Sequence, residues 1–178
     1  MERKVALMTG ATSGIGEACA RKFANGGYDL VITGRNVDRL KAVEQQARQL
    51  GADVLALEFD VRDRKAAAAA VESLKGKWAV IDVLINNAGL ALGLDKEYEG
   101  DLDDWETMVD TNVKGLLTMT RLIVPGMVER NKGHVINIGS VAGDAAYAGG
   151  SVYCATKAAV KAITDGLRIA VSYTHLRA

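Results

Sequence analysis

The chain contains only two cysteines and two histidines among its 178 residues. Cys19 and Cys154 are too few for a disulfide framework, so we interpret them as reduced thiols packed as small apolar groups. His134 and His175 have no cysteine or histidine neighbours at the spacing of metal ligands. We therefore predict no metal site.

Long apolar runs and an excess of one charge are also lacking. No stretch approaches the length of a membrane span. Lys plus Arg and Asp plus Glu number 22 each, which gives no electrostatic reason to expect nucleic acid or an anionic membrane as a partner. The N-terminus shows no apolar signal region, and this predicts a cytoplasmic protein. The length suits one domain with a sizeable core.

Short apolar runs alternate with longer helical stretches along the chain. The runs are rich in Val, Ile and Leu, as buried parallel strands are, and they occupy residues 5–8, 30–33, 54–59, 83–86 and 134–138. The helical stretches are residues 14–25, 38–50, 64–75, 102–131 and 151–171. This order predicts an α/β fold, a Rossmann-type doubly wound parallel sheet with helices on both faces. The single proline, Pro125, should kink or end the stretch 102–131.

A glycine-rich segment, "TGATSGIG", follows the first apolar run and opens the first helical stretch. Its spacing is Gly10-x3-Gly14-x-Gly16. Glycine allows a tight turn and a close approach of phosphate, and a helix N-terminus offers free N–H groups. The segment therefore favours a dinucleotide pyrophosphate site, with a purely structural turn as the alternative.

The end of the second apolar run reads Gly34-Arg35-Asn36, about 20 residues after the glycine segment. An acidic residue there would bind the ribose hydroxyls of NAD, whereas an arginine would receive the 2′-phosphate of NADP. Because Arg35 stands at this place and a guanidinium binds phosphate in a forked geometry, the sequence favours NADP(H). The alternative is a solvated arginine that precedes a helix.

Tyr153 and Lys157 stand four residues apart, which places both side chains on one face of a helix. A nearby ammonium favours the phenolate form of a tyrosine, which can then exchange a proton with a carbonyl or alcohol oxygen. The same spacing also occurs in ordinary amphipathic helices, so the pair gains meaning only from its companions.

Five sequence elements occur in a fixed order: Thr9-Gly10-x3-Gly14-Ile15-Gly16, Asn86-Asn87-Ala88-Gly89, Asn112, Ser140 and Tyr153-x3-Lys157. With this set, the chain resembles the classical short-chain dehydrogenases/reductases over about residues 4–171. Each element alone has a bland alternative: a strand end for Ser140, a backbone-bonded helix residue for Asn112 and turn formers for the asparagines.

The resemblance implies a catalytic role for four residues. Tyr153 would be the general acid/base, and Lys157 would favour its phenolate and hold the nicotinamide ribose. Ser140 would orient the substrate oxygen, and Asn112 would position a water that completes a proton relay. The reaction would be hydride transfer between a nicotinamide and a carbonyl carbon.

The resemblance also implies an NADP(H) site. Its residues would flank the phosphates, receive the 2′-phosphate, cap the adenine and border the riboses. They are Gly10, Thr12, Ser13, Gly14, Ile15, Gly16, Arg35, Asp60, Val61, Asn87, Ala88, Gly89, Tyr153 and Lys157.

A narrower resemblance is carried by residues 86–116 and 125–158, which are similar to the NADP-dependent 3-hydroxy acid (serine) dehydrogenases. It implies a small 3-hydroxy acid or serine-like substrate. One alternative is a 3-oxoacyl thioester reductase or another alcohol or ketone reductase of the same superfamily. Another is a catalytically inactive dinucleotide-binding module.

The end of the chain departs from the family pattern. Complete members continue after the Tyr–Lys helix with a further strand, a substrate-covering lobe and a last strand. We therefore expect a truncated NADP-binding domain at residues 1–171, a non-family tail at residues 172–178, and an apolar fifth strand without a neighbour at the sheet edge. Little turnover is expected of such a chain.

The family also suggests how copies would associate. Its members usually pair through the two long helices, here residues 102–131 and 151–171. We expect a homodimer of this kind, and a tetramer only for a full-length chain.

Overall fold

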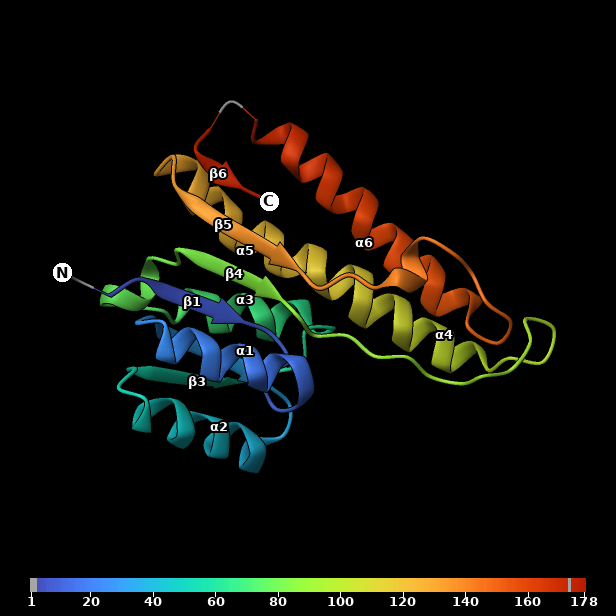
Figure 1. The fold of residues 1–178 in the computed structure, drawn as a ribbon, viewed down its shortest axis with the longest axis horizontal. Coiled ribbons are helices and arrows are strands. Elements are labelled where there is room, and N and C mark those ends of the chain that lie inside the picture. The colour runs from blue at the N-terminus through green and yellow to red at the C-terminus, as the bar shows by residue number, and fades with distance from the viewer. Residues whose placement is uncertain (1–2, 173) are drawn as a thin grey trace.

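The computed structural model describes residues 3–172 and 174–178. Within this part of the chain, a six-stranded parallel sheet has the order β3-β2-β1-β4-β5-β6 (Figure 1). Its strands are β1 (Val5–Met8), β2 (Asp29–Gly34), β3 (Val54–Glu58), β4 (Val83–Asn86), β5 (Gly133–Asn137) and β6 (Leu176–Arg177). The chain winds outward from β1 to β3 and then crosses to β4 on the other side of β1. The predicted doubly wound α/β fold is confirmed.

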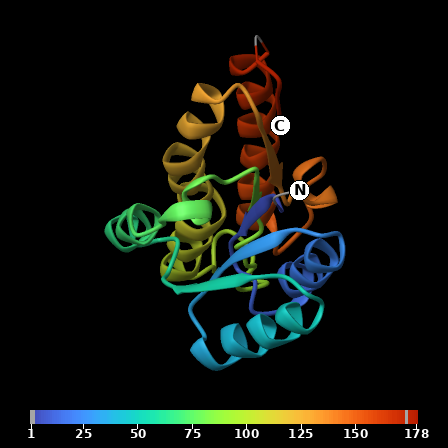
Figure 2. The same ribbon diagram turned by 90° about the vertical axis from the view of Figure 1, so that its left-hand side faces the viewer.

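Helices cover both faces of this sheet, which is seen nearly edge-on in Figure 2. They are α1 (Gly14–Asn25), α2 (Val37–Gln49), α3 (Arg64–Glu72), α4 (Leu102–Val109), α5 (Leu116–Glu129) and α6 (Ser151–Ala170). Short 3-10 helices occur at η1 (Gly76–Ala79) and η3 (Val141–Gly143). Each predicted stretch has the expected helical or strand character, in most cases with ends shifted by a few residues.

Alternation along the strands divides the core between the two faces. Leu7 and Val31 pack with residues of α3 and α5, such as Met119. Their neighbours Met8 and Ile32 instead join the residues of α1 and α2. Both faces of the central strands are buried, which explains why these strands read as continuous apolar runs.

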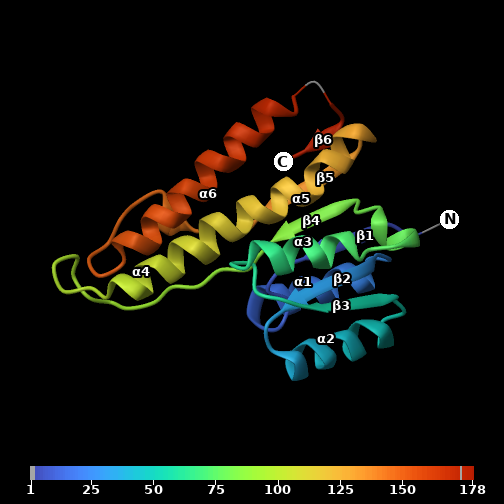
Figure 3. The same cartoon turned by 180° about the vertical axis from the view of Figure 1, so that it is seen from behind.

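The long stretch predicted as one helix, residues 102–131, is helical but not uniform. A π-helical segment, η2 (Asp110–Gly115), separates α4 from α5. The helix does not end at Pro125, because α5 runs past it to Glu129. Figure 3 shows α6 running alongside α4 and α5.

The prediction that the fifth strand has no neighbour is wrong. Leu176 and Arg177 form β6, which pairs in parallel with Gly133 and His134 at the start of β5. The Leu176 side chain is also buried, in the same hydrophobic cluster as residues of α5. The predicted tail at residues 172–178 also includes Tyr173, which lies outside the described residues.

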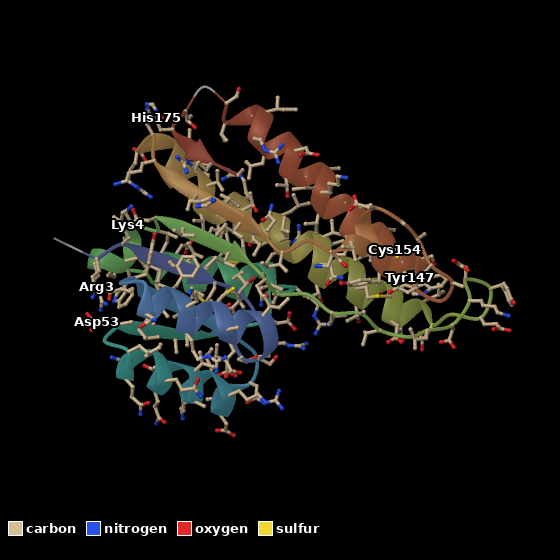
Figure 4. The ribbon with its side chains drawn as sticks, viewed as in Figure 1. Arg3, Lys4, Asp53, Tyr147, Cys154 and His175 are labelled. Carbon is tan, nitrogen blue, oxygen red and sulfur yellow. The ribbon has the colours of Figure 1, made fainter. Side chains whose placement is uncertain are left out.

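The two ends of the sheet differ in what they present. Arg3, Lys4 and Asp53 lie at the end where β1 begins, and Tyr147 and Cys154 lie at the other end near the start of α6 (Figure 4).

Within the described residues, no helix combines the length and the apolar character that a membrane span requires.

Candidate active site

A cleft of about 410 Å³ lies where the loops leave the carboxyl ends of the strands. Its walls are the segments that follow β1 through β5, together with the first two turns of α6. In open α/β sheets, ligands bind at the carboxyl ends of the strands, next to the point where the strand order reverses. Here that point lies between β1 and β4.

Nearly all residues predicted to bind the cofactor line this cleft. They are Gly10, Thr12, Ser13, Gly14, Ile15, Arg35, Asp60, Val61, Asn87, Ala88, Gly89, Tyr153 and Lys157. Gly16 lies behind the lining, where a Cβ would overlap the carbonyl oxygen of Gly10 and stand 2.5 Å from Asn87 Nδ2. The structure brings the glycine segment and the Tyr–Lys pair together in one cleft, although they are separated widely in sequence.

The glycine segment has the shape of a phosphate cradle. Gly10 and Gly14 adopt φ values of +63° and +54°, which favour glycine. A Cβ on Gly14 would meet no atom within 4 Å, so open space lies before it. No side chain caps the N-terminus of α1 at Ser13, whereas Asn36 caps α2 in the usual way. The first N–H groups of α1 are therefore available to an anion. These residues fit a dinucleotide pyrophosphate.

A reciprocal clamp joins this segment to the loop after β4. Thr9 Oγ1 accepts hydrogen bonds from the backbone N–H groups of Asn87 (3.1 Å) and Ala88 (3.0 Å). Asn87 Nδ2 in turn donates to the carbonyl oxygens of Thr9 (3.0 Å) and Gly10 (2.9 Å). Thr9 is fully buried. Sequence reasoning missed this role because its partner lies almost eighty positions away and no spacing rule connects them.

Two arginines surround the Asp60 carboxylate after β2 and β3, and of these three residues Arg35 and Asp60 line the cleft. Arg62 donates to Asp60 Oδ2 from both Nε (3.0 Å) and Nη2 (2.7 Å), and its backbone N–H binds Oδ1. Arg35 Nη1 lies 3.5 Å from the same Oδ2, and its side chain is 60% exposed. Burial raises the pKa of Asp60. The hydrogen bonds and charge of Arg62, with the charge of Arg35, lower this pKa by more, so it lies below its usual value. Arg35 is thus exposed to the cleft but partly paired with Asp60.

Tyr153 and Lys157 lie one turn apart on α6 and both face the cleft. Lys157 Nζ donates to the carbonyl oxygen of Ile138 at 2.8 Å and lies 5.9 Å from the centre of the Tyr153 ring. Burial lowers the pKa of Lys157 below its usual value, because the charged form is poorly solvated there. The pair can hold and exchange a proton at the cleft wall.

Asn112 lies in the π-helical segment behind the cleft and does not line it. Its Oδ1 accepts from Leu90 N (2.8 Å), and its Nδ2 donates to Leu90 O (2.8 Å) and to Thr156 Oγ1 (3.0 Å). Thr156 Oγ1 donates in turn to the carbonyl oxygen of Tyr153 at 2.7 Å. Asn112 thus connects a cleft wall to the turn of α6 that carries Tyr153.

Ser140 follows the cleft-lining residues Ile138 and Gly139 but does not itself line the cleft. Its Oγ accepts from Ala142 N at 3.1 Å and so caps the short helix η3. The predicted substrate contact of Ser140 stays a prediction.

Several cleft residues have no counterpart in the sequence prediction. Thr33 and Thr111 line the cleft, and their buried hydroxyls have no hydrogen-bond partner among the described residues. Gly34 lies against the side chain of Thr12, so a Cβ there would overlap it. The presence of a glycine at position 34 is the one sequence signal that could have indicated this contact.

In the described part of the chain, no group of acidic, histidine or cysteine side chains could hold a metal ion.

Comparison with known proteins gives consistent results. The family model for short chain dehydrogenases matches residues 4–178. The chain is 51% identical over 173 residues to the NADP-dependent 3-hydroxy acid dehydrogenase of Salmonella typhi, covering 97% of this chain and 68% of the relative. It superposes on the crystal structure of serine dehydrogenase from Escherichia coli with a TM-score of 0.92 and 47% identity, covering 97% and 79% of the two chains. The closed form of serine dehydrogenase complexed with NADP+ gives a TM-score of 0.93 at 47% identity, covering 97% and 68%.

Proposed function

The chain belongs to the short chain dehydrogenase family, and from this premise we propose that it is an NADP(H)-dependent oxidoreductase acting on a small hydroxy or oxo acid. The observation that carries the proposal is one cleft that holds both the uncapped glycine segment and the Tyr153–Lys157 pair. A binding module would need the first but not the second.

Different residues of the cleft bind different parts of the cofactor. The glycine segment and the first N–H groups of α1 bind the pyrophosphate, and Arg35 binds the 2′-phosphate. Asp60 and Val61 border the adenine, and Lys157 holds the nicotinamide ribose. When bound, the nicotinamide supplies or accepts the hydride.

Tyr153 is the general acid/base of the reaction. Its hydroxyl donates a proton to the oxygen of a carbonyl substrate, or takes one from an alcohol in the reverse direction. The Lys157 ammonium stabilises the phenolate that remains, and its burial makes release of its own proton easier. Ser140 orients the substrate oxygen, and Asn112 supports the proton relay behind Lys157.

The proposed substrate is a 3-hydroxy acid or a serine-like compound, oxidised at the β-carbon to a 3-oxo acid. Support comes from the relatives named for 3-hydroxy acids and for serine. The runner-up within the family is a 3-oxoacyl thioester reductase.

Steady-state rates distinguish these substrates. We expect the rate of NADP+ reduction, at whatever absolute level the chain turns over, to be higher with serine or 3-hydroxyisobutyrate than with a 3-hydroxyacyl thioester. We also expect NAD+ to be a poor acceptor. Faster turnover of the thioester would reassign the substrate class. Cofactor binding without turnover of either would support a binding module instead.

We also propose that two copies pair through the helices of residues 102–131 and 151–171. These helices lie side by side, and Val109, Leu117 and Ile169 expose apolar side chains on them. Exposed apolar surface of this kind is common at interfaces between subunits.

A further inference from the structure

Arg39 lies in the first turn of α2, four residues after Arg35. Its backbone N–H donates to the capping Asn36 Oδ1 at 3.0 Å. Its guanidinium, by contrast, has no ion pair and no hydrogen bond to any residue that the structure describes, and the residue is exposed. An arginine without a partner is a cation available to an anionic ligand.

The Arg39 side chain borders a hollow of about 270 Å³ between the start of α1 and the stretch of α2 from Arg39 to Gln46. Thr12 and Ser13 line both this hollow and the cofactor cleft, so the two spaces share a wall. Arg39 lines the hollow together with Thr12 and Ser13. Arg35 stands on the cleft side of Thr12 and Ser13, and Arg39 stands on the other side.

Charge balance indicates that Arg35 alone is a weak anion site. Arg35 shares the Asp60 carboxylate with Arg62, so part of its charge is already compensated. A phosphate monoester carries a charge of about −2 at neutral pH, which one partly compensated guanidinium does not balance. Arg39 is the nearby arginine whose charge is uncompensated.

Glu17 is the opposing charge in the hollow. Its carboxylate Oε1 lies 3.5 Å from Arg21 Nη1, one turn further along α1. This ion pair offsets part of the repulsion that Glu17 would exert on a phosphate near Thr12 and Ser13.

We propose that Arg39 is a second cation for the 2′-phosphate of NADP(H), acting with Arg35 across the shared wall of Thr12 and Ser13. Arg39 is therefore a specificity-determining residue, and its removal lowers the preference for NADP(H) over NAD(H). The inference rests on the proposed function, because it names a residue for the phosphate of the proposed cofactor.

Binding of 2′,5′-ADP and 5′-AMP, measured by calorimetry, isolates the contribution of the phosphate without any need for turnover. We expect Arg39→Gln to weaken 2′,5′-ADP binding about five- to tenfold, the range between an exposed ion pair and a charge-assisted hydrogen bond. Binding of 5′-AMP should not change. Arg39→Lys, which keeps the charge but loses the fork, should fall between Arg39→Gln and the unaltered protein.

Lys41→Gln is the matched control, since Lys41 is an exposed cation on the same helix that does not line the hollow. Equal losses of 2′,5′-ADP affinity in Arg39→Gln and Lys41→Gln would overturn the inference and leave the proposed function intact. If the unaltered protein bound 2′,5′-ADP no better than 5′-AMP, the proposed cofactor preference would itself be wrong. Thermal unfolding of each variant confirms that the fold is kept.

Discussion

Replacing Gly16 with alanine should destabilise the protein, although alanine favours helices. Intrinsic propensity alone would make alanine better than glycine in a helix by about 1 kcal/mol. In this structure, a Cβ at Gly16 would overlap the carbonyl oxygen of Gly10 and stand 3.0 Å from Ala11 Cα. These are backbone atoms of the glycine segment, which cannot rotate aside as a flexible side chain would.

The size of the effect follows from opposing contributions. Overpacking of a tight site costs about 1–3 kcal/mol, and contact with backbone belongs at the upper end of that range. After the gain in helix propensity is subtracted, we expect a net loss of about 2 kcal/mol. For a chain of this length that loss lowers the melting temperature by roughly 6 °C. Because the glycine segment is displaced, NADPH binding should weaken as well.

Gly166 provides the matched control. It lies inside α6, it is exposed, and a Cβ there would meet nothing within 4 Å. Gly166→Ala should therefore show the propensity gain alone, a rise in melting temperature of roughly 3 °C. Calorimetry or circular dichroism of both variants tests the pair. If Gly16→Ala stabilises the protein as much as Gly166→Ala does, the close packing of α1 on the glycine segment is refuted.

The Thr9 clamp, the burial of Lys157 and the pairing of two copies can each be tested separately. Thr9→Val should cost about 1–3 kcal/mol in urea unfolding, because it leaves the half-buried N–H of Ala88 without its partner, whereas Asn87 N keeps its bond to Ile85 O at 3.1 Å. Thr9→Ser, which retains the hydroxyl, should keep the clamp. Burial lowers the pKa of Lys157, so the native protein releases this proton at a lower pH than the unfolded protein does. The stability of the unaltered protein relative to Lys157→Met should therefore rise with pH between the lowered native pKa and 10.5, and a flat difference would contradict the burial. Light scattering after size exclusion should give the mass of two copies. A charged substitution at Leu117, an exposed apolar residue of α5, should give the mass of one copy.

The sequence predicts the sheet well where burial is complete. Residues 5–8 and 83–86 form β1 and β4 with the predicted bounds, because strands buried on both faces read as nearly continuous apolar runs. The strand β6 was missed, since Leu176 and Arg177 are too short a segment to show any periodicity. The π-helical segment was also missed, because it keeps the apolar pattern of the helix around it.

The candidate site divides in the same way. Residues in short local patterns, such as Gly10, Gly14 and the Tyr153–Lys157 pair, were predicted from their spacing together with the resemblance to the family. Contacts made across the fold could not: nothing in the sequence connects Thr9 with the loop after β4, or Arg62 with Asp60 as a competitor of Arg35. These contacts depend on how parallel strands bring distant loops to one edge of the sheet.

The most direct test of the proposed function compares Tyr153→Phe with the unaltered protein. NADP+ reduction with serine or 3-hydroxyisobutyrate is followed by absorbance, and NADPH binding by fluorescence. We expect the substitution to abolish turnover and to leave NADPH binding intact, because it removes only the hydroxyl that exchanges the proton. Undiminished turnover in Tyr153→Phe would show that Tyr153 is not the general acid/base.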